Sequence, residues 1–241
     1  MISKNKIKLI RSLEMKKNRK AAGLFVAEGP KVVGDLLDAG YCANMLFSTK
    51  EFPNAELITD EELRKISFLQ HPQEILAVFK IPINVPLPTL NAQLCLVLDG
   101  VQDPGNLGTI IRIADWFGIT DIICSPDTVD VYNPKVVQAT MGSIAHVHVV
   151  YTDLLEFMNS LPPTYPVYGT LLDGENIYEQ ELSSDGIIVM GNEGNGISPE
   201  LRKHITKRLL IPDFHTNDLR AESLNVAIAT AITCSEFRRR K

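Results

Sequence analysis

Six short, almost unbroken apolar runs in the second half of the chain restrict its fold more than any other feature. They read LCLVLDG, DIICS, HVHVV, VYGTLL, GIIVMG and RLLIP, and stretches with helical spacing lie between them. Strands that are apolar on both sides are typical of parallel sheets whose two faces are covered by helices. We therefore expect an α/β domain built on a parallel sheet in residues 92–241.

The first 80 residues also alternate between predicted helices and strands. A basic helix is expected after Ser3, GLFVAEG, NMLFST and EILAVFK predict strands, and PKVVGDLLDAG predicts a helix. Thr59 and Glu62 have the spacing of a capping box for a short helix that ends near Ile66. These elements fit a small α/β/α sandwich in residues 1–80.

A proline-rich stretch separates the two parts. Residues 81–91 contain Pro82, Pro86 and Pro88, and proline is excluded from helix interiors and central strands. We expect an extended linker here, which places the boundaries of the second domain at residues 92–241.

The charge of the chain is unevenly distributed. The net charge is −5, yet residues 1–20 hold eight of the 24 basic residues and one of the 29 acidic ones, and the chain ends in Arg238, Arg239, Arg240 and Lys241. Such clusters can bind phosphate groups whatever the total charge, although basic chain ends can also be merely solvated. Both interpretations stay open at this point.

Other patterns indicate the compartment of the protein. The sequence has no apolar run of membrane-spanning length and no signal-peptide core. Cys42, Cys95, Cys124 and Cys234 show no C-x-x-C spacing, so we expect reduced thiols in a cytoplasmic protein.

Several common site chemistries lack their sequence patterns. The first strand of the second domain is not followed by G-x-G-x-x-G, which argues against a dehydrogenase, and neither a phosphate loop nor a G-x-S-x-G elbow is present. His146 and His148 have no third ligand nearby, so we expect no metal site.

The stretch DGVQDPGNLGTIIRIADWFG predicts a helix with two faces. Its apolar face comprises Leu107, Ile110, Ile111 and Ala114, whereas Arg112 lies off that face. A ligand close to the backbone would explain the glycines, and a tight turn beside a solvated arginine is the alternative. A last helix from about Glu222 is expected to bury Leu224, Ala227, Ile228, Ala231 and Ile232.

Three segments resemble the signature motifs of the SpoU/TrmH family of RNA ribose 2′-O-methyltransferases, within the SPOUT class. The segments are LDGVQDPGNLGTIIRIADWFG, IIVMGNEGNGIS and LLIPDFHTNDLRAESLNVAIATAI, and they occur in the family's order. AAGLFVAEGPKVVGDLLDAG is similar to the L30e-like RNA substrate-binding domain that many members carry. The resemblance covers nearly the whole chain.

The resemblance implies a trefoil knot in the C-terminal part of the catalytic domain, S-adenosylmethionine as cofactor, and a homodimer whose active site lies near the subunit interface. The cofactor would be held mostly by backbone groups. The implied cofactor-binding residues are Thr170, Leu171, Gly191, Asn192, Gly196, Ile211 and Leu224.

The resemblance also implies a set of catalytic residues, namely Asn106, Arg112, Glu193, Ser223 and Asn225. A guanidinium in water keeps its proton beyond pH 12, so Arg112 is expected to orient the hydroxyl and anchor phosphate rather than to act as a simple base. On local sequence alone, Asn106 and Ser223 could instead be helix caps, and Glu193 a solvated loop acid.

One stretch departs from the family pattern. The connection IPDFHTNDLRAESLN is longer than in many relatives and adds His215, Asp218 and Arg220, so residues 213–222 could reshape the cofactor site or contact RNA.

The function expected from the resemblance is S-adenosylmethionine-dependent methylation of a ribose 2′-hydroxyl, with ribosomal RNA as the first choice of substrate. Transfer RNA as substrate, a base as methyl acceptor, and a non-catalytic RNA-binding protein of the same fold are the alternatives.

Overall fold

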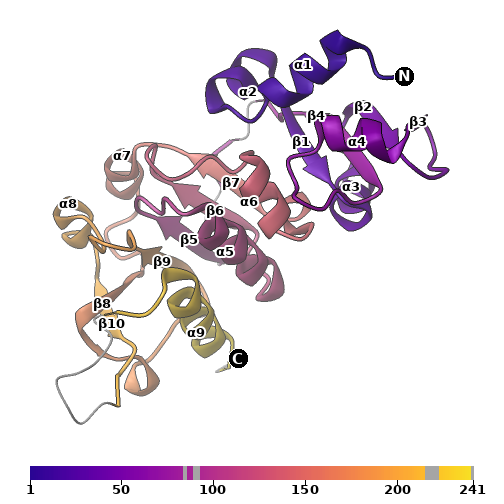
Figure 1. Ribbon diagram of the computed structural model, residues 1–241. Coiled ribbons are helices and arrows are strands. Elements are labelled where there is room, and N and C mark those ends of the chain that lie inside the picture. Colours follow the sequence, from indigo (N-terminus) through magenta and orange to yellow (C-terminus); the bar gives the residue numbers. More distant parts are fainter. Residues whose placement is uncertain (84–85, 89–92, 215–222, 240–241) are drawn as a thin grey trace. The chain divides into compact units, whose positions relative to one another are not determined.

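The computed structural model describes residues 1–83, 86–88, 93–214 and 223–239. The chain forms two compact units (Figure 1): Met1–Asn84 with Asp130–His146, and Val85–Val129 with Val147–Lys241. Each unit contains its own sheet.

The first unit is built on a four-stranded sheet of order β1-β4-β2-β3. Its strands are β1 (Leu24–Glu28), β2 (Ala43–Ser48), β3 (Glu56–Leu57) and β4 (Ile75–Lys80). β4 is antiparallel to both β1 and β2, and β3 is parallel to β2. The helices are α1 (Lys4–Ser12), α2 (Lys16–Ala22), α3 (Pro30–Asp38), α4 (Asp60–Ile66), α6 (Pro134–Ala139) and the 3₁₀ turn η1 (Ser143–Ala145).

Local sequence signals account for most of these elements. Ser3 caps α1, and Thr59 and Glu62 form the predicted capping box of α4. The predicted strands at β1, β2 and β4 and the predicted helix α3 are confirmed. The sequence did not predict α2. Its residues, KKNRKAA, are all polar or alanine, and the one that is buried is Arg19. Such a segment has no apolar residues at helical spacing.

The segment Asp130–His146 belongs to the first unit, although the predicted boundary assigns it to the second domain. Arg19, which is 2% exposed, donates from Nε and Nη2 to Asp130 Oδ2 at 2.9 and 2.5 Å. The rings of Phe25 and Tyr132 pack with their centroids 4.7 Å apart. The sequence does not reveal this assignment, because the segment lies between β6 (Asp121–Cys124) and β7 (His148–Tyr151), two strands of the second unit's sheet.

The second unit contains a six-stranded sheet of order β10-β8-β9-β5-β6-β7, in which every neighbouring pair is parallel. This confirms the α/β fold with a parallel sheet. The strands are β5 (Leu94–Leu98), β6 (Asp121–Cys124), β7 (His148–Tyr151), β8 (Val167–Asn176), β9 (Gly186–Met190) and β10 (Lys207–Leu210). The helices are α5 (Pro104–Trp116), α7 (Leu154–Asn159), η2 (Ile177–Glu179), α8 (Pro199–Arg202) and α9 (Val226–Arg239).

Helices α5 and α9 pack side by side in the same direction. The predicted apolar face of α5 is buried, and Gly108 is buried with it. At the C-terminal end of the pair, Arg238 donates to the carbonyls of Phe117 and Gly118 at 2.7 and 3.0 Å. The Arg238 guanidinium is therefore not merely solvated, since it satisfies carbonyls that the end of α5 leaves unpaired. Arg240 and Lys241 lie outside the described residues.

The buried face of α9 matches the predicted one only in part: Ala227 is buried as expected, and Ala231 and Ile232 are half-buried. Leu224 and Ile228 are about half exposed, whereas the buried residues are Val226, Ala227, Thr230, Thr233, Cys234, Glu236 and Phe237. The hydroxyls of Thr230 and Thr233 donate to carbonyls one turn back, at 2.7 and 2.8 Å. Because these hydroxyls are satisfied within the helix, threonine can face the core, and an apolar count alone predicts only part of the buried face.

The parallel arrangement brings the loops after β5, β9 and β10 to the carboxyl end of one sheet, the edge at which ligands bind in such folds. Among the described residues, no helix is long and apolar enough to span a bilayer.

Candidate active site

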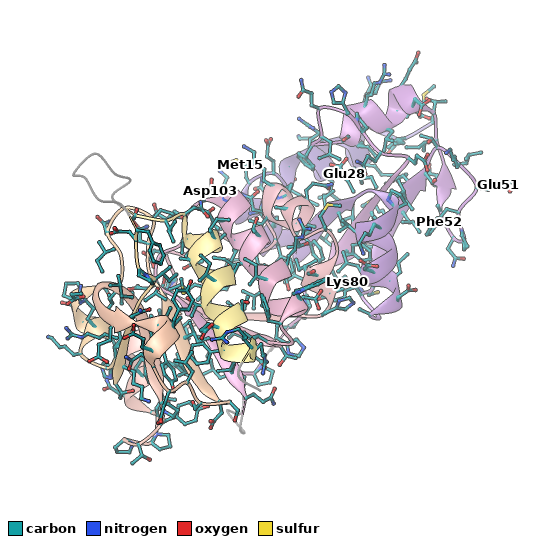
Figure 2. All side chains as sticks on the ribbon, turned by 90° about the horizontal axis from the view of Figure 1, so that it is seen from below. Met15, Glu28, Glu51, Phe52, Lys80 and Asp103 are labelled. Atoms are coloured by element: carbon teal, nitrogen blue, oxygen red, sulfur yellow. The ribbon has the colours of Figure 1, made fainter. Side chains whose placement is uncertain are left out.

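Asn106 lies in the first turn of α5, and its side chain is not used to cap that helix. Asp103 (labelled in Figure 2) caps the helix, and its Oδ1 accepts from the backbone N–H of Asn106 at 2.8 Å. Pro104 occupies the first helical position, where its missing N–H costs nothing. The interpretation of Asn106 as a cap is wrong, since Asp103 fills that role and leaves the Asn106 amide available.

Glu193 comes from the loop after β9 and binds the same helix end. Its carboxylate accepts from the backbone N–H of Gln102 and Asp103, both at 3.3 Å, and from Asn106 Nδ2 at 2.9 Å. A helix N-terminus favours a negative charge. Partial burial raises the pKa of Glu193, but the hydrogen bonds from Asn106 and the backbone outweigh it and lower the pKa below its ordinary value. The interpretation as a solvated loop acid is therefore wrong.

Asn225 completes the network from the start of α9. Its Nδ2 donates to Asn106 Oδ1 at 2.9 Å, and its Oδ1 accepts from the backbone N–H of Ala227 and Ile228 at 2.9 and 3.3 Å. Asn225 is thus the cap of α9, which explains an asparagine at the head of an apolar helix. These hydrogen bonds fix the orientation of the Asn106 amide. Glu193 accepts from its Nδ2, and Asn225 donates to its Oδ1, so a flipped amide would lose both.

The loop between β9 and α8 is a tight turn. Asn192 and Gly196 exchange two backbone hydrogen bonds of 2.9 Å, and Asn192 Nδ2 donates to the carbonyl of Gly100 at 2.6 Å. A Cβ on Gly191 would lie 2.2 Å from the carbonyl carbon of Gly196 and 2.3 Å from Ile197 N. Glycine is required at 191 because two backbone segments of the chain meet there.

The ladder between β8 and β10 is interrupted at the same end of the sheet. Arg208 pairs with Gly169, but the next residue, Leu209, pairs with Glu175, so residues 170–174 leave the ladder. A Cβ on Gly174 would lie 2.6 Å from the carbonyl carbon of Leu209. Sequence reasoning missed Gly174; a glycine inside a strand pattern was the available signal.

The predicted cofactor-binding residues differ in what they contact. Thr170 is half-buried and its hydroxyl contacts Met190 Sδ at 3.5 Å, while the Leu171 side chain packs in the core with Val189 and Ile197. Within the described residues, the backbone groups of Gly191, Ile211 and Leu224 make no hydrogen bond. Uncovered backbone donors and acceptors are what a ligand held by main-chain groups requires.

A comparison with known protein families decides which family these features belong to. Residues 93–235 match the model of the SpoU rRNA Methylase family, which spans all the residues described above. The chain belongs to the SpoU rRNA methylase family. Residues 4–77 match the MRM3-like substrate binding domain.

Relatives of the SpoU family protein support this over its whole length. It is 31% identical to the 23S rRNA (guanosine(2553)-2′-O)-methyltransferase RlmP of Bacillus subtilis (strain 168), covering 97% of this chain and 96% of the relative. A Porphyromonas gingivalis protein assigned to the TrmH family of RNA methyltransferases has a solved structure with 44% identity, a TM-score of 0.86 and full coverage of both chains. An AdoMet-bound rRNA methyltransferase from Sinorhizobium meliloti aligns at 31% identity and a TM-score of 0.85, over 100% of this chain and 96% of that one.

Two predicted site residues of the SpoU family protein stand apart from the network. Arg112 and Ser223 are exposed, and neither makes a hydrogen bond or ion pair within the part of the chain that is described. Arg112 follows Asn106 by six residues, about 240° around the helix, so the two side chains leave α5 on different faces. His215, Asp218 and Arg220 of the long loop lie outside the described residues.

Proposed function

We propose that this SpoU family member transfers the methyl group of S-adenosylmethionine to a ribose 2′-hydroxyl of ribosomal RNA. The observation that carries the proposal is the network of Asn106, Glu193 and Asn225, since it joins side chains from three distant motif segments at the ligand-binding edge of the sheet.

The cofactor fits the residues at this edge. The free backbone groups of Gly191, Ile211 and Leu224 would hold its polar atoms, and the 170–174 segment, which leaves the ladder, would form the neighbouring wall. Leu172 is 78% exposed and Leu224 is 50% exposed, so apolar side chains are available to the adenosine part. When bound, S-adenosylmethionine supplies a methyl group on a positively charged sulfur.

The chain contributes position rather than a nucleophile. Asn106 is held by Glu193 and Asn225 in a single amide orientation, which can direct the sugar at the head of α5. Arg112, with no partner among the described residues, is available to bind a phosphate or the 2′-hydroxyl. Holding reacting atoms in line contributes about 7–11 kcal/mol to lowering a barrier.

Ribosomal RNA is favoured as substrate by the two relatives that align with nearly the whole chain and act on rRNA: RlmP and the Sinorhizobium meliloti enzyme. Both alignments include the first unit.

The finer architecture is also part of the proposal. We assign residues 1–80 to an L30e-like RNA-binding domain, 81–91 to a linker and 92–241 to a SPOUT domain with a trefoil knot, whose segment Asp130–His146 is part of the first compact unit. The solved relatives with TM-scores near 0.85 support this assignment. A homodimer is supported by exposed apolar side chains on the paired helices, Trp116 at 85% and Ile228 at 52%. Cytoplasmic location stays a prediction.

The product nucleotide tests the reaction. The protein is incubated with tritiated S-adenosylmethionine and, in separate reactions, unmodified 23S rRNA or transfer RNA, and the RNA is hydrolysed with alkali. A 2′-O-methyl group blocks this cleavage, so the expected product is a labelled, alkali-resistant dinucleotide from rRNA. Label in single nucleotides would indicate a methylated base, and binding of rRNA without label would indicate the non-catalytic alternative.

A further inference from the structure

The first unit carries its positive charge on one pair of helices. Residues 1–20, which include α1 and most of α2, hold eight basic residues and a single acidic one, Glu14. Residues 21–241 contain 16 basic and 28 acidic side chains. A chain with a net charge of −5 thus keeps one strongly basic segment.

On α1 three of the four basic side chains occupy the face opposite the core, and the fourth, Lys6, pairs with Glu56 at 2.7 Å. Lys4, Lys8 and Arg11 follow each other at i, i+4 and i+7, which puts them on one stripe about 10 Å long. Ile10 on the other face is buried. Arg11 is anchored, since its Nη1 donates to the carbonyl of Ser67 at 2.5 Å and its guanidinium lies 4.8 Å from the Phe68 ring.

Helix α2 is fixed beside α1 by its one buried cation. Arg19 Nη1 donates to the carbonyls of Leu13 and Glu14 at 2.8 and 2.7 Å, in the turn between the two helices. With Arg19 directed inward, Lys16, Lys17 and Lys20 remain exposed. We call the exposed side chains Lys4, Lys8, Arg11, Lys16, Lys17 and Lys20 the basic face.

The lysines of the basic face are for the most part not engaged with carboxylates. Within the described residues, Lys4, Lys8, Lys17 and Lys20 make no hydrogen bond or ion pair. Elsewhere in the unit Lys31 pairs with Asp35 at 2.8 Å and Lys50 pairs with Glu74. The side chains of Lys65, Lys80 and Lys135 also make no hydrogen bond or ion pair among the described residues, so the basic face is distinguished by the close spacing of its cations in the chain. Cations without a carboxylate partner are the ones available to an external anion.

We propose that the basic face is the surface on which this protein binds the phosphate backbone of its RNA, and that it does so without reading the bases. The proposal rests on the proposed function only in taking RNA as the substrate. Residues 1–23 contain no aromatic side chain on which a base could stack. Lysine contacts to phosphate position a protein on nucleic acid and carry no sequence information.

The test compares two triple variants that remove the same charge from the same unit. Lys8→Gln/Lys17→Gln/Lys20→Gln alters the basic face, and the matched control Lys31→Gln/Lys50→Gln/Lys65→Gln alters exposed lysines outside it. Binding of the full chain to a fluorescein-labelled RNA stem-loop is measured by anisotropy at about 50 to 200 mM KCl, a range in which phosphate contacts are strongly salt-dependent.

The basic-face variant is expected to bind the stem-loop about tenfold or more weakly at 100 mM KCl, with the slope of log K against log salt reduced by about 2–3. The control is expected to stay within about twofold, and a second stem-loop of unrelated sequence is expected to give the same result. Equal weakening by both variants, an unchanged basic-face variant, or dependence on the stem-loop sequence would overturn the proposal.

These outcomes are separable from the proposed function. S-adenosylmethionine affinity, measured by calorimetry, and Tm are expected to be unchanged in both variants, which shows that each is folded. Loss of the salt slope in a protein that transfers no methyl group would leave this inference standing and refute the methyltransferase. Methyl transfer with an unaltered slope would refute this inference alone.

Discussion

Replacing Glu193 by glutamine tests whether the carboxylate holds the head of α5 and the Asn106 amide together. The carboxylate accepts four hydrogen bonds: two from backbone N–H groups at 3.3 Å, one from Asn192 Nδ2 at 3.5 Å and one from Asn106 Nδ2 at 2.9 Å. A glutamine would accept through one oxygen only and would turn an NH₂ group towards another donor. Hydrogen bonds to charged groups contribute about 1.5–3 kcal/mol each. Three of these four are long and the Glu193 side chain is largely exposed, so we expect a total loss of about 1–2 kcal/mol.

The stability difference between the natural protein and Glu193→Gln should depend on pH. The pKa of Glu193 is lowered in the folded protein, because its hydrogen bonds outweigh the burial that raises it. The carboxylate therefore stabilises the fold above the pKa of the unfolded state, and this contribution is lost as the pH falls through the lowered folded-state pKa. Glu193→Gln should be less stable than the natural protein at pH 7, and the difference should vanish in acid.

Urea unfolding at pH 7 and at about pH 3 measures the difference, and at pH 7 a Tm lower by about 2–6 °C should accompany it. Glu181→Gln is the matched control, since Glu181 is exposed and accepts from Lys207 through its backbone carbonyl rather than its carboxylate. A Glu193→Gln protein as stable as the control at pH 7, or a deficit independent of pH, would refute the role given to the carboxylate.

Four further substitutions test other parts of the structure. Gly191→Ala places a methyl group 2.2 Å from a backbone carbon and should weaken S-adenosylmethionine binding at least about tenfold in calorimetry, since relaxing the clash must move the loop. Arg19→Ala leaves Asp130 without its buried partner and should cost about 3–5 kcal/mol in urea unfolding; a loss below about 1 kcal/mol would contradict this. Arg112→Ala should lower turnover while calorimetric cofactor affinity persists, and lost affinity would count against its assigned role. Burial raises the pKa of Glu28 despite its hydrogen bonds, so ionisation disfavours the fold as the pH rises from about 4.5 through the raised value. Glu28→Gln should therefore gain stability relative to the natural protein between pH 4 and pH 7. A stability difference that is constant over this range would contradict the raised pKa.

Local chemistry made much of the fold predictable. The apolar runs around Leu96 and Ile188 required a sheet buried on both faces, and the capping box at Thr59 fixed the start of α4. These features depend on neighbours in sequence, which is why the pattern alone sufficed. The buried face of α9 was not predictable in this way, because Thr230 and Thr233 satisfy their hydroxyls within the helix.

The candidate site was predictable only through the family resemblance. Asn106, Glu193 and Asn225 carry no shared local signal, and each has an ordinary structural explanation when taken alone. Their grouping depends on hydrogen bonds between residues 87 and 119 positions apart. Gly174 was missed because the residue that requires it, Leu209, lies on a strand formed much later in the chain.

Because Asp130–His146 is part of the first unit, that unit cannot finish folding until this segment has been synthesised. When residue 84 leaves the ribosome, Phe25 still lacks Tyr132 and Arg19 lacks Asp130. About 60 more residues must be translated before the unit can close, which takes roughly 3–12 s at about 5–20 residues per second. During that interval the nascent unit exposes an uncovered aromatic surface and an unneutralised arginine, and a truncation placed at the apparent domain boundary would make that state permanent.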